Sequence, residues 1–282
     1  MTSGSRRRQT GVGSVISPYP ARLFDDVRES TRRLKPLLHE TMSGNGRLYD
    51  CKDPAVWRSV LAIYEDVIKA KATASKGVKA GKLTALDKWY QEELPEIVRS
   101  RTEKFLTHAE LVQLMEWKLT RGKFRPMLQK MVASNSVSSV ESCTRKAFKL
   151  LPDVSAAITE LTKLKAVGPA TASAVLVTGA PQEAAFMADE AVESIPGLVP
   201  IKYTLKHYIL YLDKVRECVE QLNTNDSVND WTPHKIEQCL WTWAVAKSVK
   251  PSLLESPVMH QNKMTNKEKL TEVRPMKRQK VQ

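Results

Sequence analysis

The stretch that decides the fold runs from Leu161 to Ser194 and reads LTKLKAVGPATASAVLVTGAPQEAAFMADEAVES. Its first half predicts two helices joined by a tight turn. Gly168 tolerates turn conformations that other residues resist, and Pro169 suits the first position of the following helix. We expect that second helix to end at Gly179. The backbone N–H groups at its start have no partner within the helix, so this end is predicted to attract a phosphate.

The second half of the stretch leads through a Gly/Pro-containing connection to an acidic pair, Asp189-Glu190. An Asp directly before Glu-Ala-Val-Glu is typical of a helix N-cap. A carboxylate at such a place can also stabilise the positive charge that develops on a sugar when the bond to its base breaks. The two roles are compatible, and Asp189 is the candidate catalytic residue of the chain.

Helix signals recur along most of the 282 residues, whereas strand patterns are nearly absent. Four helix starts are predicted from capping residues, at Asp53-Pro54, Thr107–Glu110, Ser138–Glu141 and Thr232-Pro233. The sequence therefore predicts an all-α fold.

The predicted organisation is one multi-helix domain over residues 21–248, which contains the hairpin segment at 155–195. Residues 1–20 and 249–282 are polar and basic without apolar periodicity, so both are predicted to be disordered tails. Most of the net charge of +13 lies in these tails. Basic runs at 6–8 and 276–280 predict a nuclear location, and the cytoplasm is the alternative.

A second basic feature, WKLTRGKFRP at 117–126, lies inside the domain and contains no acidic residue. Cations interleaved with aromatic rings suit phosphate contacts combined with base stacking. The alternative is a helix end whose cations favour the helix dipole while its aromatic residues are buried. The candidate nucleic-acid contacts here are Trp117, Lys118, Arg121, Lys123 and Arg125.

Cofactor and membrane signals are missing from the sequence. The four cysteines are scattered, with no CxxC and no paired histidine, so we predict neither a zinc site nor an iron–sulfur cluster. No apolar run approaches the roughly 18 residues of a membrane span. We therefore expect no metal, no cofactor and no membrane partner.

The pattern LxxLxxVGPxTA, followed by a Gly/Pro-bearing loop and an Asp, resembles the helix-hairpin-helix (HhH-GPD) superfamily of base-excision DNA glycosylases. The residues that match the hairpin pattern are Leu164, Val167, Gly168, Thr171 and Ala172, with Asp189 behind them. The resemblance implies that the hairpin amides hold a DNA phosphate and that Asp189 assists loss of a base. The hairpin residues it places at nucleic acid are Val167, Gly168, Ala170 and Thr171.

Two departures from that family narrow the expectation. Ala170 stands where members with lyase activity carry a lysine, and the iron–sulfur cysteines of several members are absent. The resemblance therefore implies a monofunctional, glycosylase-like DNA-binding protein with a role in DNA repair. Two alternatives stay open: a non-catalytic helix-hairpin-helix module that binds nucleic acid, and a scaffold whose hairpin packs internally while only the tails contact polyanions. Whether the chain is an enzyme is undecided by its residues.

Overall fold

The computed structural model describes residues 46–74 and 79–255. Residues 21–45 of the predicted domain, the tail at 1–20 and both basic runs at the ends lie outside these ranges. Every regular element within the described ranges is helical, so the all-α prediction is confirmed there. The elements are η1 (Leu48–Asp50), α2 (Pro54–Ala62), α3 (Tyr64–Ala74), α4 (Lys79–Lys88), the π-helix η2 (Trp89–Glu93), α5 (Leu94–Ser100), α6 (His108–Arg121), α7 (Pro126–Ala133), α8 (Val137–Leu150), α9 (Val154–Leu161), α10 (Pro169–Gly179), α11 (Asp189–Glu193), α12 (Leu205–Asn225), α13 (Pro233–Val249) and α14 (Ser252–Glu255).

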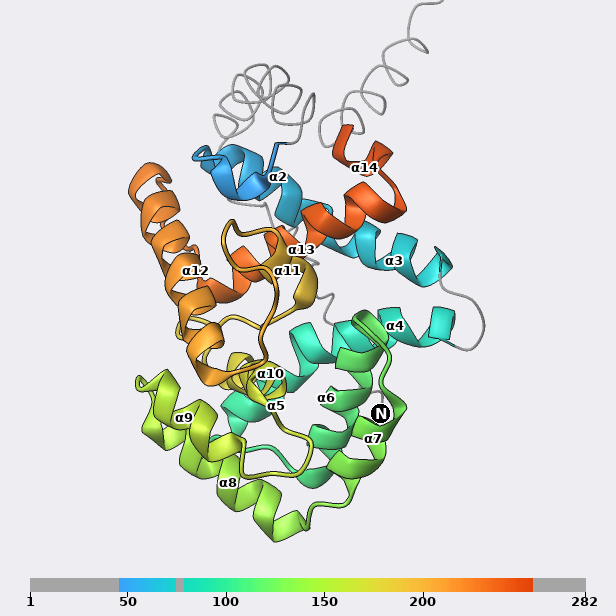
Figure 1. Cartoon of the computed structure of the whole chain (residues 1–282), viewed down its shortest axis with the longest axis vertical. Helices are drawn as coiled ribbons and strands as arrows, with labels where there is room; N and C mark the ends of the chain where they lie inside the picture. The colour runs from blue at the N-terminus through green and yellow to red at the C-terminus, as the bar shows by residue number, and fades with distance from the viewer. Residues whose placement is uncertain (1–45, 75–78, 256–282) are drawn as a thin grey trace, which may run out of the picture.

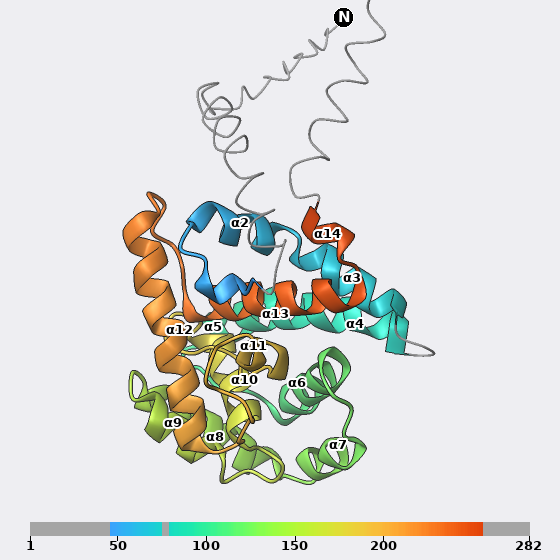
Figure 2. The ribbon, with the colours of Figure 1, turned by 45° about the horizontal axis from the view of Figure 1, so that its top comes forward.

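Two buried helices organise the packing (Figure 1). Residues 170–178 of α10 are all buried, and α5, α6, α8, α9 and α12 pack around this helix. The second is α13, which lies between α2 and α11 and also contacts α3, α12 and α14 (Figure 2). A helix that is buried all round belongs to the interior rather than to a surface. The apolar spacing of α13 predicts one inward face, but the helix is buried on several sides. The buried residues include the charged Glu237.

Capping residues set most of the predicted helix starts. The Asp53 carboxylate accepts the Ala55 amide at 2.9 Å, and Thr107 and Glu110 form the expected capping box. Thr232 caps α13 with Pro233 behind it. The predicted box at Ser138 is wrong by two residues, because the Ser136 hydroxyl accepts the Ser139 amide at 3.1 Å and begins α8.

One short helix lies beyond the predicted C-terminal boundary of the domain. At the C-terminal end, α14 lies within the segment assigned to a disordered tail, and its Leu254 is buried. Between α4 and α5 the chain forms one turn of π-helix, and Pro95 sits in the first turn of α5. No helix in the described ranges is both long enough and apolar enough to cross a membrane.

Candidate functional site

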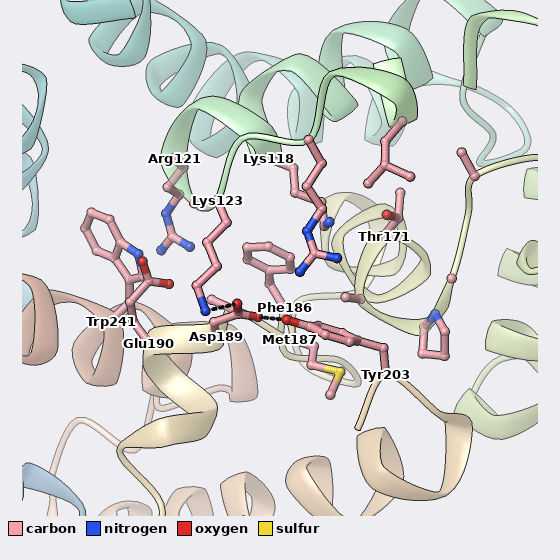
Figure 3. A pocket seen from close by; sticks show the side chains of 18 residues that line it. Lys118, Arg121, Lys123, Thr171, Phe186, Met187, Asp189, Glu190, Tyr203 and Trp241 are labelled. Atoms are coloured by element: carbon pink, nitrogen blue, oxygen red, sulfur yellow. Dashed lines mark hydrogen bonds and ion pairs between the residues drawn. The ribbon is translucent and has the colours of Figure 1, made fainter. Parts of the chain in front are cut away.

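A cavity of about 230 Å³ opens where the end of α6, the start of α10 and the start of α11 meet (Figure 3). Its wall comes from the segments 118–128, 166–171 and 186–190, together with Tyr203 and Trp241. The volume lies below the roughly 300–1,000 Å³ of a typical small-molecule site. The cavity therefore suits a single ring-sized group better than a large cofactor.

The turn before α10 is built differently from the expectation. Ala166 takes the left-handed conformation with φ of 63°, whereas Gly168 is extended with φ of −89° and ψ of −179°. The Asn135 side chain holds the turn from outside, because it accepts the Lys165 amide at 2.8 Å and donates to the Lys165 carbonyl at 3.1 Å. The turn is thus fixed by a left-handed alanine and an asparagine, and Gly168 is not needed for its backbone angles.

The number of available amides at the start of α10 is small. Thr171 and Ala172 both donate to the Gly168 carbonyl, and Pro169 has no N–H. Within the described part of the chain this leaves the amides of Gly168 and Ala170 without an acceptor. Two free amides at a helix N-terminus still favour an anion.

The predicted hairpin contacts divide by burial. Gly168 is exposed and lines the cavity, and Ala170 and Thr171 line it from nearly buried positions. Val167 does not line the cavity, because its side chain is buried in the core. A side-chain contact of Val167 with nucleic acid is therefore excluded in this structure.

Trp117 does not serve as a stacking platform. Its ring is fully buried and stacks on Tyr90, with centroids 3.4 Å apart, and its indole N–H donates to Asp87 at 2.8 Å. A base cannot reach this ring while the core is intact. The prediction that Trp117 contacts nucleic acid is wrong for this structure.

Arg121 is also part of the core, although it reaches the inner wall of the cavity. Its side chain is 1% exposed, and Nη1 donates to the Glu237 carboxylate at 2.9 Å. The guanidinium also lies 4.1 Å from the centroid of the Trp241 ring. Arg121 is therefore an internal counter-charge rather than a surface phosphate contact.

The spacing of these two residues offers a sequence signal for their burial. Leu114, Trp117 and Arg121 are three and four residues apart and thus share one face of α6, which is the buried face. Helical periodicity places Arg121 on this buried face, with Lys118 beside it, and so separates both from Lys123 and Arg125 beyond the end of the helix.

The remaining cations of the segment do face the cavity (Figure 3). Lys118 is half-buried, and its pKa is lowered by burial, with a smaller opposing effect from Asp189. Lys123 is 62% exposed, and Arg125 lies 5.4 Å from the centroid of the Tyr203 ring. Both segments predicted to bind nucleic acid, the basic run at the end of α6 and the amide-bearing start of α10, thus line one site.

Asp189 faces the same site instead of capping its helix. It is the first residue of α11, behind Ala188 at the cap position, and makes no capping hydrogen bond. Its Oδ1 accepts the Tyr203 hydroxyl at 2.8 Å, and its Oδ2 lies 2.9 Å from Lys123 Nζ (Figure 3). The carboxylate is 15% exposed. The predicted N-cap role is wrong, whereas the position in the site is compatible with chemistry.

A second carboxylate, Glu190, lines the inner part of the cavity. It forms an ion pair with Lys71 at 3.3 Å, and burial lowers the pKa of that lysine. Asp189 and Glu190 are therefore each matched by a lysine. This balance reduces the repulsion that two carboxylates would exert on an incoming phosphate.

Three aromatic residues of the site were missed by sequence reasoning: Phe186, Tyr203 and Trp241. Tyr203 is 42% exposed, binds Asp189 and carries Arg125 against its ring. No local pattern marks it, because its partners lie 14 and 78 residues away along the chain. It takes the place that the sequence predicts for Trp117 as the accessible ring of the site.

The chain matches no protein-family model, and no curated protein or solved structure is significantly similar to it. Within residues 46–74 and 79–255, no group of three His, Cys, Asp or Glu side chains could hold a metal ion. The interpretation of the site therefore rests on its own geometry.

Proposed function

We propose that this protein binds DNA through the cavity and removes a base there, with Asp189 as the catalytic carboxylate. One observation carries the proposal: the cations after α6, the free amides at the start of α10 and Asp189 line a single cavity. These three segments are about 50 and 20 residues apart in the sequence. A purely internal hairpin would leave no such opening between them.

Phosphate binding is assigned to the exposed part of the site. Lys123 and Arg125 offer positive charge at the cavity, and the Gly168 and Ala170 amides offer neutral donors. The Lys123–Asp189 ion pair is largely exposed on the lysine side, and such pairs contribute only about 0–1 kcal/mol. A DNA phosphate can therefore compete for Lys123 and leave Oδ2 of Asp189 available.

The chemistry is assigned to Asp189. Breaking the bond between a base and its sugar develops positive charge on the sugar, and a nearby carboxylate stabilises that charge or orients an attacking water. The Tyr203 hydroxyl holds Oδ1, which fixes the orientation of the carboxylate. The base has to leave the duplex at a cost of a few kcal/mol, and the cavity volume fits one such ring.

Base release from duplexes that each carry one damaged or mismatched base tests this function. We expect Asp189→Asn to lower the rate by about 100-fold or more, the usual loss when a group that stabilises transition-state charge is removed. Glu217→Gln is the matched control. Glu217 lies on α12, is 63% exposed, pairs with Lys214 and does not line the cavity. Release that survives Asp189→Asn would remove Asp189 from the mechanism.

A non-catalytic DNA-binding module is the second candidate, and one observation favours it. Both oxygens of Asp189 are engaged, by Tyr203 and by Lys123, as in a structural carboxylate. This candidate predicts salt-dependent DNA affinity without base release from any substrate.

Affinity for duplex DNA at several salt concentrations separates both candidates from binding by the tails alone. In the full-length chain, neutralising Lys123 and Arg125 to Gln should reduce the salt slope by about 2, which is about 1 for each phosphate that the variant no longer neutralises. The control neutralises two exposed cations away from the cavity, Lys82 and Arg99. An unchanged slope in the Lys123/Arg125 variant would assign the affinity to residues outside the cavity.

A further inference from the structure

Lys118 differs from the other cations that line the cavity. Arg121 is paired with Glu237, Lys123 with Asp189, and Arg125 rests on the Tyr203 ring. The backbone carbonyl of Lys118 accepts the Gly122 amide, but its side-chain ammonium group has no hydrogen bond and no ion pair with any residue that the structure describes. A half-buried ammonium group without a partner is costly, and it is therefore a feature to explain.

The position of Lys118 is internal rather than peripheral. It projects from the last turn and a half of α6 into the cavity, on the side of Thr171, while Lys123 reaches Asp189 from the loop beyond the helix (Figure 3). The charged groups whose fields act on Lys118 are Asp189, which favours the ammonium form, and Arg125, which opposes it. An ammonium group set inside a small cavity is poorly placed to track a phosphate backbone at the surface.

The chemical character of Lys118 fits a nucleophile. Burial lowers its pKa, so a larger fraction is the neutral amine near neutral pH than for an exposed lysine. A lysine in a desolvated site next to another cation is the usual form of an amine that attacks carbonyl carbon. The carbonyl compound has to fit about 230 Å³ and to be attached to a polyanion that Lys123 and Arg125 can hold.

We propose that Lys118 is an amine nucleophile that forms an imine with the C1′ aldehyde of an abasic deoxyribose in DNA. The inference rests on the proposed function, because base removal leaves such a sugar in the same cavity. It assigns a second reaction, strand cleavage at abasic sites, to a residue outside the hairpin.

The reaction balances without any oxidant or reductant. The Lys118 nitrogen adds to C1′ of the ring-opened sugar, and loss of one water gives the iminium ion. The Asp189 carboxylate takes a proton from C2′, and the C3′–O bond breaks so that the 3′ phosphate leaves with the bonding electrons. Hydrolysis of the resulting unsaturated imine breaks the C1′–N bond and regenerates the amine, and Asp189 returns its proton to water. The unsaturated aldehyde stays attached to the DNA through its 5′ phosphate.

Reduction with sodium borohydride tests the proposal, because it converts the imine to a stable amine. Full-length protein is mixed with a duplex that contains one abasic site, and the covalent protein–DNA adduct is measured on a denaturing gel. Peptide mass mapping then identifies the attached residue. We expect the adduct at Lys118, and we expect Lys118→Arg to lower its yield by at least about tenfold, since a guanidinium keeps the charge but forms no imine.

Lys82→Arg is the matched control, since Lys82 is 58% exposed on α4 and pairs with Glu116 away from the cavity. Its adduct yield should equal that of the wild type. Affinity of Lys118→Arg for the same abasic duplex should change by no more than about threefold, because its charge is retained. A merely electrostatic role for Lys118 would leave both the affinity and the adduct yield intact.

The proposal is overturned if the wild type gives no adduct, if Lys118→Arg gives as much as the wild type, or if the attached residue is another lysine or the N-terminal amine. Mapping on the wild type decides the question even where a variant folds poorly. The substrate already lacks its base, so the assay does not require base removal. Base release without an adduct would contradict the Lys118 inference alone, and an adduct without base release would contradict the proposed function alone.

Discussion

The ion pair between Arg121 and Glu237 can be broken from one side by Arg121→Met. Both side chains are 1% exposed and are joined at 2.9 Å. Methionine keeps much of the apolar volume of the arginine, so the main loss is the counter-charge of Glu237. Removing one partner of a buried ion pair costs about 3–5 kcal/mol of unfolding free energy, because the other charge stays buried and uncompensated. We expect a loss of this size at pH 8.

The pH dependence of that loss has a defined sign. Burial already raises the pKa of Glu237 to about 7. Without Arg121 that pKa rises further, so folded Glu237 binds a proton more tightly than unfolded Glu237. Stability contributed in this way is present at low pH and is lost as the pH rises. Urea unfolding of Arg121→Met should therefore show a smaller deficit at pH 6 than at pH 8.

The double variant Arg121→Met/Glu237→Leu is the control, because it leaves no buried charge and should be more stable at pH 8 than the single variant. A single-variant deficit below about 1 kcal/mol, the size seen for exposed pairs, would refute the internal role of Arg121. A salt slope of DNA binding reduced by about 1 in Arg121→Met would also refute it, since a reduction of that size indicates that wild-type Arg121 neutralises a phosphate.

Three further predictions concern single sites. Burial lowers the pKa of His234 to about 3, so the folded state keeps this side chain neutral while the unfolded state takes up a proton below about pH 6.5. This difference should remove about 2 kcal/mol of unfolding free energy between pH 7 and pH 5. Urea unfolding of His234→Gln should therefore show a smaller loss of stability over this pH range than the wild type. An added Cβ at Gly179 would lie 2.6 Å from Phe148 Cε1, so Gly179→Ala should cost about 1–3 kcal/mol in thermal unfolding, and an unchanged melting temperature would show that this contact relaxes freely. Nothing lies within 4 Å of an added Cβ at Gly168, so Gly168→Ala should change stability by less than about 0.5 kcal/mol. Its methyl group beside the free amides should nevertheless weaken binding to an abasic duplex, and equal affinity would argue against a phosphate at this turn.

Local signals were sufficient for most helix starts. The caps at Asp53 and Thr107 depend on atoms within three residues, so the sequence is enough to predict them. The start of α8 shows the limit of this reasoning. Ser138 has the stronger local signal because Glu141 follows it by three residues, yet the Ser136 hydroxyl is the one that caps α8.

The candidate site was only partly predictable, because its contacts join distant segments. Asp189 has the sequence context of a cap, and only the fold brings Tyr203 and Lys123 to its two oxygens. Likewise, the basic run after residue 117 contains both inward and outward cations. The buried partner of Arg121 is Glu237, which is more than 100 residues away in the sequence. No sequence pattern near Arg121 predicts this ion pair.

The burial of α10 has a consequence for motion. Its residues from 171 to 178 are sealed inside the fold, whereas the Gly168 and Ala170 amides at its start have no acceptor within the described chain. In hydrogen exchange, the sealed amides should exchange only when the whole domain opens, and the first two should exchange freely. The segment at α10 thus contains amides with the slowest exchange and, at its start, amides with fast exchange. A ligand that slows exchange of the Gly168 and Ala170 amides would be detected by comparison with the slow amides a few residues away.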